Sequence, residues 1–193
     1  DHKLWIATYQ GLCLLNPVNG RFTDMTQPGN DCLTSRLTSC ITEDNQGNIW
    51  IGTTEKGINV LSIEADTLTH YYHQSWNPYS LPDNYVECIF CSQNGNIWIG
   101  THQGLVKYNG GCKPFQRISQ TEELQVKGIQ EDSQQHLWIT TNKGLLLSDA
   151  NGNILRKFHD YHGLTDNNLS RAICSLTNGN IVIGGNNGFS LFR

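Results

Sequence analysis

Residues 97–101, Ile97-Trp98-Ile99-Gly100-Thr101, form a motif that recurs along almost the whole chain. Closely similar runs occupy residues 4–8, 49–53 and 137–141, and a divergent run with Val in place of Trp occupies residues 181–185. The central positions 5, 50, 98, 138 and 182 are 45, 48, 40 and 44 residues apart. In a chain rich in strand-forming residues, this period predicts a β-propeller, in which each repeat forms one blade of about four strands.

The composition agrees with a strand-rich globular protein. Of the 193 residues, 37% are hydrophobic, only 16% are charged and 19 are glycine, and a chain of this length can bury a core without disulfides or metals. The net charge of −4 argues against nucleic acid or an anionic membrane surface as a partner. No apolar run is long enough to span a bilayer. The seven irregularly spaced cysteines do not suggest a disulfide framework.

The order of strands within a blade follows from the residues around the Trp motif. An Asn-Gly turn such as Gln93-Asn94-Gly95-Asn96 precedes the motif and joins it to an earlier antiparallel strand. After the motif come a loop that ends in glycine, a third strand and a more polar fourth strand, which suits an outer edge. The earlier strand carries a small residue ten positions before each centre, as expected of a buried innermost strand near the axis. These small residues are Cys40, Cys88, Gly128 and Ala172.

We therefore expect an all-β fold, a partial β-propeller of four-stranded antiparallel blades that occupies residues 1–193 as one domain. Complete blades are expected at about 33–73, 81–119 and 124–161, with incomplete blades at about 1–26 and 164–193. A propeller closes by pairing its first and last blades. Two open edges would remain here, so we expect a larger propeller or completion by a second copy or segment.

The run from Leu81-Pro82-Asp83-Asn84 through Asn94-Gly95-Asn96 to Gly104-Leu105 resembles the repeat of the two-component regulator propeller family. The preceding repeat is similar through Leu33-Thr34-Ser35-Arg36, Glu43-Asp44 and residues 47–53. The resemblance extends over all five copies. The sequence departs from the family pattern at Trp76, where a polar residue is usual, and in the last copy at Val182 and Gly185.

The resemblance implies a periplasmic sensor region of a hybrid two-component histidine kinase of the Bacteroidetes type, without a cofactor. In that family, two seven-bladed propellers usually precede a β-sandwich, a transmembrane helix and the cytoplasmic kinase and regulator domains. The chain would then be the C-terminal portion of the second propeller. Its implied partners are the remaining blades and neighbouring domains, a second subunit in a homodimer, and an oligosaccharide released from a complex carbohydrate. Any membrane attachment would come from a transmembrane helix outside this chain.

Three groups of residues invite a chemical role but have a simpler structural explanation. Cys88 and Cys91 form a C-x-x-C pair, yet side chains three apart on a strand point to opposite faces and cannot easily share a metal ion. The same parity separates the His pairs in residues 70–73 and 159–162. Asp44 and Asp132 precede hairpin turns, where capping of the turn is the expected role of Asp. We therefore predict neither a metal site nor catalytic residues.

The connection of residues 71–79, Tyr71-Tyr72-His73-Gln74-Ser75-Trp76-Asn77-Pro78-Tyr79, has more aromatic residues than a connection needs. In a propeller it opens on the same face as the loops between second and third strands. Aromatic rings and polar groups together match the two kinds of surface on a sugar. The predicted ligand-binding residues are Tyr72, Trp76, Tyr79, His102 and Lys143. The alternative is that Tyr72 and Trp76 pack the loop down or contact a neighbouring domain.

The leading hypothesis is a non-enzymatic sensor propeller that recognises a carbohydrate breakdown product and relays this signal to a kinase. Two other functions remain open. A propeller lyase or hydrolase would convert its substrate and would have a site of clustered His and carboxylate side chains. A protein-interaction scaffold would require a macromolecular partner and no small ligand.

Overall fold

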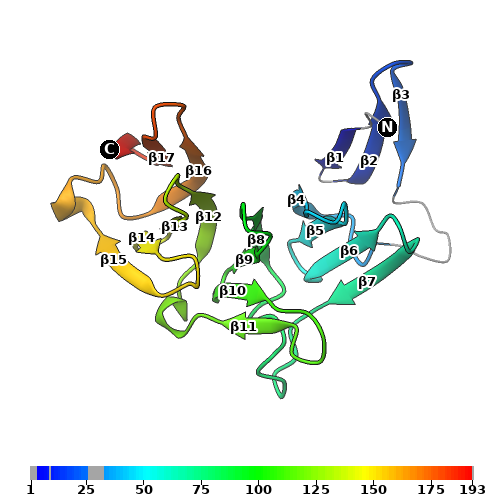
Figure 1. Cartoon of the computed structure of the whole chain (residues 1–193), viewed down its shortest axis with the longest axis horizontal. Coiled ribbons are helices and arrows are strands. Elements are labelled where there is room, and N and C mark those ends of the chain that lie inside the picture. Colours follow the sequence, from blue (N-terminus) through cyan, green and yellow to red (C-terminus); the bar gives the residue numbers. More distant parts are fainter. Residues whose placement is uncertain (1–3, 9, 26–32, 193) are drawn as a thin grey trace.

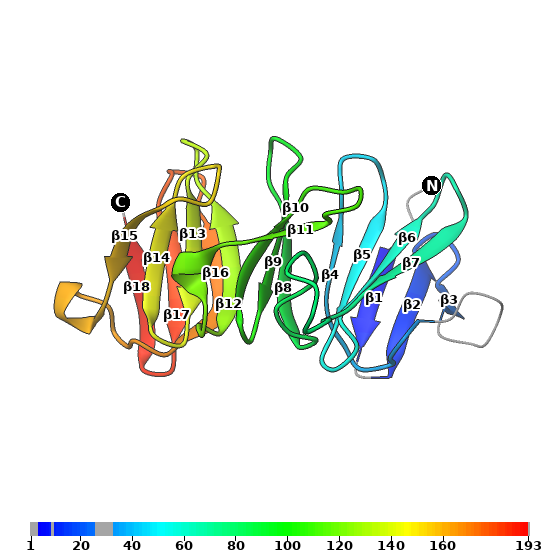
Figure 2. The ribbon, with the colours of Figure 1, turned by 90° about the horizontal axis from the view of Figure 1, so that it is seen from below.

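A computed structural model describes residues 4–8, 10–25 and 33–192. Within these ranges the chain forms five antiparallel sheets, with the orders β1-β2-β3, β4-β5-β6-β7, β8-β9-β10-β11, β12-β13-β14-β15 and β16-β17-β18. Figure 1 shows the sheets as an open arc, and Figure 2 shows their strands running between two faces that carry the loops. The all-β partial propeller with three four-stranded and two three-stranded blades is confirmed. Residues 1–3, 9 and 26, which belong to the expected first blade, lie outside the described residues.

The strands follow the repeat closely. The first two sheets comprise β1 (Leu4–Thr8), β2 (Gly11–Asn16), β3 (Arg21–Asp24), β4 (Thr38–Glu43), β5 (Ile49–Thr53), β6 (Ile58–Ser62) and β7 (Thr67–Tyr71). The third and fourth comprise β8 (Val86–Cys91), β9 (Ile97–Thr101), β10 (Gly104–Tyr108), β11 (Phe115–Arg117), β12 (Val126–Glu131), β13 (Leu137–Thr141), β14 (Gly144–Ser148) and β15 (Ile154–Phe158). The fifth comprises β16 (Leu169–Ser175), β17 (Ile181–Gly185) and β18 (Gly188–Phe192). Two short 3-10 turns, η1 (Ser119–Thr121) and η2 (Asp160–His162), complete the assignment.

The inner strands β4, β8, β12 and β16 contact one another in succession and line a common axis. The motif strands β5 and β9 lie second in their sheets, and each of their residues is buried. Both faces of such a strand pack against neighbouring side chains, which is why the motif is an unbroken apolar run rather than an alternating one.

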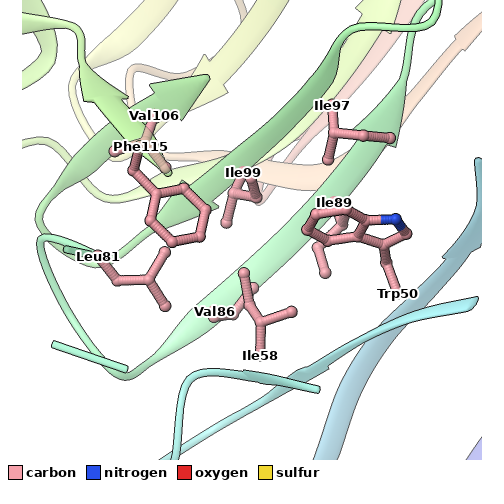
Figure 3. Packing of buried hydrophobic residues seen from close by; sticks show 9 residues of the cluster. All are labelled: Trp50, Ile58, Leu81, Val86, Ile89, Ile97, Ile99, Val106 and Phe115. Atoms are coloured by element: carbon pink, nitrogen blue, oxygen red, sulfur yellow. The ribbon is translucent and has the colours of Figure 1, made fainter. Parts of the chain in front are cut away.

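The hydrophobic core lies between blades rather than within them. In the cluster drawn in Figure 3, Trp50 and Ile58 of the second sheet pack against Val86, Ile99 and Phe115 of the third. Similar clusters join the first sheet to the second, the third to the fourth and the fourth to the fifth. Each blade therefore depends on its neighbour for burial of its apolar face, as is general in repeat proteins.

The small inner residues lie opposite a complementary partner on the motif strand. Cys40 pairs with Gly52 and Cys88 with Gly100, whereas Gly128 pairs with Thr140, so the smaller residue changes sides in the fourth blade. Gly128 is buried, and Cys40 and Cys88 are partly buried.

The expected burial of Ala172 is wrong. Ala172 lies on the innermost strand of the fifth sheet but is exposed, because within the described residues no further sheet covers that side of β16.

The residue after each loop glycine is also exposed where no further sheet covers it, and to a larger extent. Phe189 is 70% exposed, although its counterparts in the four other sheets are at most 1% exposed. Those counterparts, each covered by the next sheet along the chain, are Leu12, Ile58, Leu105 and Leu145.

Candidate ligand-binding face

Two sets of loops share one face of the propeller, as the strand order predicts. The loop after each motif strand is hydrogen-bonded to the connection that precedes an inner strand. The backbone N–H groups of Thr54, His102 and Asn142 donate to the carbonyls of Leu37, Tyr85 and Gln125 at 3.0, 3.2 and 3.2 Å. We call this the loop face.

The aromatic connection on the loop face is a fixed structure. The Ser80 hydroxyl contacts the Gln74 backbone N–H at 3.0 Å and the carbonyls of Gln74 and Asn77 at 3.0 and 2.8 Å. The side chain of Asn84 accepts a 2.7 Å hydrogen bond from the His73 backbone N–H. Leu81 is fully buried beneath the connection. Hydrogen bonds of the Ser80 and Asn84 side chains therefore hold the backbone of this loop, which forms no strand over residues 74–80.

The aromatic side chains of the connection project from this base. Trp76 is 79% exposed, Tyr72 51% and Tyr79 38%, with the Lys113 ammonium 4.7 Å from the centre of the Tyr79 ring. Within the described chain, the exposed Trp76 does not pack the loop down. The other part of the alternative, contact with a neighbouring domain, stays open. An exposed aromatic ring on a pinned loop is suited to recognition, since little ordering is needed on binding.

The five predicted residues do not form one group. The connection that carries Trp76 and Tyr79 lies beside the outer strand β11, where the Phe115 N–H donates to the Tyr79 carbonyl at 3.2 Å (Figure 1). His102 instead contacts Glu87 of the inner strand β8. Lys143 is exposed, and its backbone N–H is held by the Thr141 hydroxyl at 3.0 Å. The loop face thus has an aromatic rim, formed by Tyr72, Trp76 and Tyr79. It also has a separate polar group near the axis, centred on Glu87, which we call the axial group.

Each of the inner strands β4, β8, β12 and β16 has a β-bulge, and the bulges of β8 and β16 place Glu87 and Arg171 in the axial group. The ladder skips Ser39 in β4, Glu87 in β8 and Lys127 in β12, and it shifts across the segment of β16 that holds Arg171. A bulge turns a side chain out of the regular alternation. All four residues stand eleven positions before the centre of their repeat.

Glu87 is the centre of the axial group. Its side chain is 7% exposed, and its Oε2 accepts a 2.7 Å bond from Nη2 of Arg171, two sheets away. Its Oε1 lies 2.8 Å from Nε2 of His102 and 2.7 Å from Nε2 of Gln125. The Tyr85 ring stacks on His102 with centroids 3.8 Å apart and planes 12° apart. A buried carboxylate with this many hydrogen-bond partners is fixed in place.

Sequence reasoning missed Glu87, Arg171, Tyr85 and Gln125. A signal was present in the repeat, because the position before each small inner residue is always polar, as Ser, Glu, Lys or Arg. Only the bulge, which has no sequence mark of its own here, turns that position toward the axis.

The strand parity expected to separate His159 from His162 is wrong, because these residues lie at the 3-10 helix η2 with ring centroids 6.2 Å apart. The Cys and Asp candidates have structural roles in the described residues. Cys88 packs toward the fourth sheet and Cys91 toward the second, on opposite sides of β8. Asp44 caps its turn through the backbone N–H groups of Gln46 and Asn48, each at 2.9 Å, and also accepts a 2.8 Å bond from Trp50 Nε1. Asp132 has the same pattern and contacts Trp138 Nε1 at 3.0 Å. No group of three His, Cys, Asp or Glu residues that could hold a metal ion occurs among the described residues.

Comparison with known proteins gives a family match and a set of similar structures. Residues 33–55 and 80–103 match a family described as two component regulator propeller. The extracellular domain assigned to the hybrid two-component system BT3049 of B. thetaiotaomicron is 28% identical, with a TM-score of 0.77, over 98% of this chain and 25% of that one. The corresponding domain of BT4673 is 24% identical, with a TM-score of 0.79, over 99% of this chain and 24% of that one.

Enzymes share the fold as well. A catalytically inactive variant of virginiamycin B lyase from Staphylococcus aureus, solved with quinupristin, is 15% identical, with a TM-score of 0.70, over 99% of this chain and 66% of that one. At that identity the likeness shows the fold alone. A search of curated proteins found no match.

The chain spans about a quarter of the length of the two extracellular-domain structures. Within the described ranges, none of the helices could cross a membrane.

Proposed function

The chain carries repeats of the two-component regulator propeller family, and from this we propose that it forms part of a periplasmic sensor propeller of a hybrid two-component system. In this proposal the propeller recognises a carbohydrate breakdown product and relays its binding to a cytoplasmic histidine kinase. The observation that carries the proposal is the similarity to an extracellular domain of such a system, at 28% identity over 98% of the chain.

The aromatic rim supports a saccharide as the ligand. Trp76 and Tyr72 present flat apolar surfaces to solvent on a loop that is already ordered. His102 and Lys143 bring polar groups to the same face. A sugar ring has an apolar face and a polar edge, and such a surface can satisfy both. Tyr72, Trp76, Tyr79, His102 and Lys143 remain our proposed contacts, with the rim and the axial side as two parts of one face.

The relay requires partners beyond this chain. A ligand shifts an equilibrium between two arrangements only by the difference in its affinity for them. We propose that the remaining blades and neighbouring domains, and a second subunit in a homodimer, supply those arrangements. The exposure of Phe189, where four counterparts are buried by a following sheet, supports a further blade against β18.

The segment is proposed to be non-catalytic. Its axial His102 and Glu87 are bound to each other and to Gln125, and Glu87 also to Arg171. This arrangement fixes the carboxylate rather than leaving it free to take a proton from a substrate.

Calorimetric titration of oligosaccharide digests tests the proposal in the native-length protein that contains this chain. We expect at least one saccharide to bind and to be recovered unchanged. Conversion of the bound saccharide would favour the lyase or hydrolase alternative, and a failure of every saccharide to bind would contradict the proposal.

A further inference from the structure

A small cavity opens beside the axial group on the loop face. It has a volume of about 230 Å³ and is lined by residues of four sheets and their loops. Its lining residues are Ala7, Thr8, Thr38, Ser39, Thr54, Tyr85 and Arg171. It is separate from the aromatic rim, none of whose residues line it.

Arg171 gives this cavity a fixed cation. Its guanidinium uses two N–H groups, from Nη2 to Glu87 at 2.7 Å and from Nη1 to the Ser39 carbonyl at 3.3 Å. A guanidinium has five N–H donors, so three stay available in the described structure. The side chain is 55% exposed, and a ligand can therefore reach it. The bond to Glu87 anchors the guanidinium across the axis.

A second cation lies at an equivalent bulge. Arg171 and Glu87 form an ion pair at 2.7 Å, in which their two charges offset each other. Lys127 stands at the equivalent bulge of β12, where its ammonium donates to the neutral Asn168 side chain at 2.7 Å and has no acidic partner among the described residues. Among the four bulge residues the two cations thus exceed the one carboxylate. Planar carboxylates match the guanidinium fork in geometry as well as in charge.

The rest of the lining suits a hydroxylated ring. The Tyr85 ring is held by stacking on His102, and the hydroxyls of Tyr85 and Thr54 make no hydrogen bond within the described residues. An ordered aromatic ring beside unengaged hydroxyls can contact both a sugar face and its hydroxyl groups. A volume of about 230 Å³ leaves room for a small ligand rather than a chain of sugars.

We propose that this axial cavity binds the carboxylate of an acidic sugar, with Arg171 as the anion-binding residue and Tyr85 beside the sugar ring. The inference rests on the proposed saccharide-sensing function and adds a preference for uronic acids over neutral sugars. The rim would then contact a neighbouring unit or another part of the ligand.

Matched sugar pairs test this preference by calorimetry in the native-length protein: glucuronate against glucose, and galacturonate against galactose. We expect a uronate to bind at least tenfold more tightly than its neutral counterpart, and Arg171→Gln to remove that preference. Lys113→Gln is the matched control, because Lys113 contacts Tyr79 at the rim outside the cavity. It should leave the preference unchanged.

Arg171→Gln also removes the arginine partner of the buried Glu87 carboxylate, so folding must be controlled. The double variant Glu87→Gln with Arg171→Gln removes both charges and should fold while losing the uronate preference equally. Equal affinity for the members of both pairs, a preference that survives Arg171→Gln, or no uronate binding at all would overturn the inference. Binding of neutral oligosaccharides without any uronate preference would overturn the inference alone and leave the proposed function standing.

Discussion

Cys88 lies directly opposite Gly100 across β8 and β9, and its sulfur is 2.6 Å from the point that a Cβ at Gly100 would occupy. The same point lies 2.7 Å from Val126 Cγ1 and 2.8 Å from the Val126 carbonyl oxygen in the next sheet. Gly100 therefore lets two blades approach closely at the axis. The Cys40–Gly52 pair repeats the relationship in the second sheet.

Gly100→Ala should destabilise the protein by about 1–3 kcal/mol, because the added methyl group overpacks the contact between blades. Chemical unfolding measures the loss. Gly185→Ala is the matched control and should cost less, since the added Cβ would lie 3.3 Å from its nearest neighbour, Asp166 Cβ. Equal stability of Gly100→Ala and the parent would contradict the packing described here. Cys88→Phe should overpack the same contact from the inner strand, with a similar loss.

The bond between Asp44 and Trp50 can be separated from capping of the turn. Asp44→Ala should cost about 1–3 kcal/mol because it leaves the buried Trp50 N–H without a partner. Asp149 caps a turn through Asn151 and Asn153 in the same way but holds no Trp. Asp149→Ala should therefore cost less, and an equal cost in urea unfolding would show that the indole bond contributes nothing.

Acid should weaken the hydrogen bonds that Asp44 and Asp132 accept from their turns and from the Trp indoles. Burial raises the pKa of Asp44, but bonds from Trp50, Asn48 and Gln46 outweigh this effect and hold its pKa below the ordinary value; Asp132 behaves alike. A carboxyl whose pKa is depressed by folding stabilises the protein above its unfolded pKa of about 3.9, and that stability is lost as the pH falls through its folded pKa. The free energy of unfolding should therefore fall as the pH is lowered from about 5 to below the depressed folded pKa of these carboxyls. The fall should be smaller in the Asp44→Asn, Asp132→Asn double variant, and an identical fall would contradict this account.

The inner thiols should resist alkylation. Burial raises the pKa of Cys40 to about 11 and raises that of Cys88 still further, so little reactive thiolate forms at pH 8. Cys112 and Cys174 are exposed and should react first. Mass spectrometry of peptides after iodoacetamide treatment distinguishes the sites. Modification of Cys88 as fast as Cys112 in the folded protein would contradict the burial of its sulfur.

The repeat made most of the fold predictable. The strand order and the shared loop face both follow from the spacing of the motif and its turns. The sequence did not reveal that the aromatic connection would lie at the outer rim while His102 turned to the axis, because the distance from the axis depends on packing between blades. The prediction that Ala172 is buried was wrong for a related reason. Its position in the repeat matches the other small inner residues, but no sheet among the described residues covers it. Glu87 and Arg171 were missed because a bulge re-aims them.

The role of the exposed ring on the pinned loop tests the sensing account most directly. Calorimetric titration of oligosaccharides into the native-length protein should show several-fold weaker binding for Trp76→Ala, since a stacked aromatic ring contributes about 1 kcal/mol. The melting temperature should stay nearly unchanged, because Trp76 is 79% exposed. Leu155→Ala, which removes an exposed side chain from the outer strand β15, is the control and should alter neither. Equal saccharide affinities for Trp76→Ala and the parent, or a large drop in melting temperature, would contradict saccharide recognition by the aromatic rim.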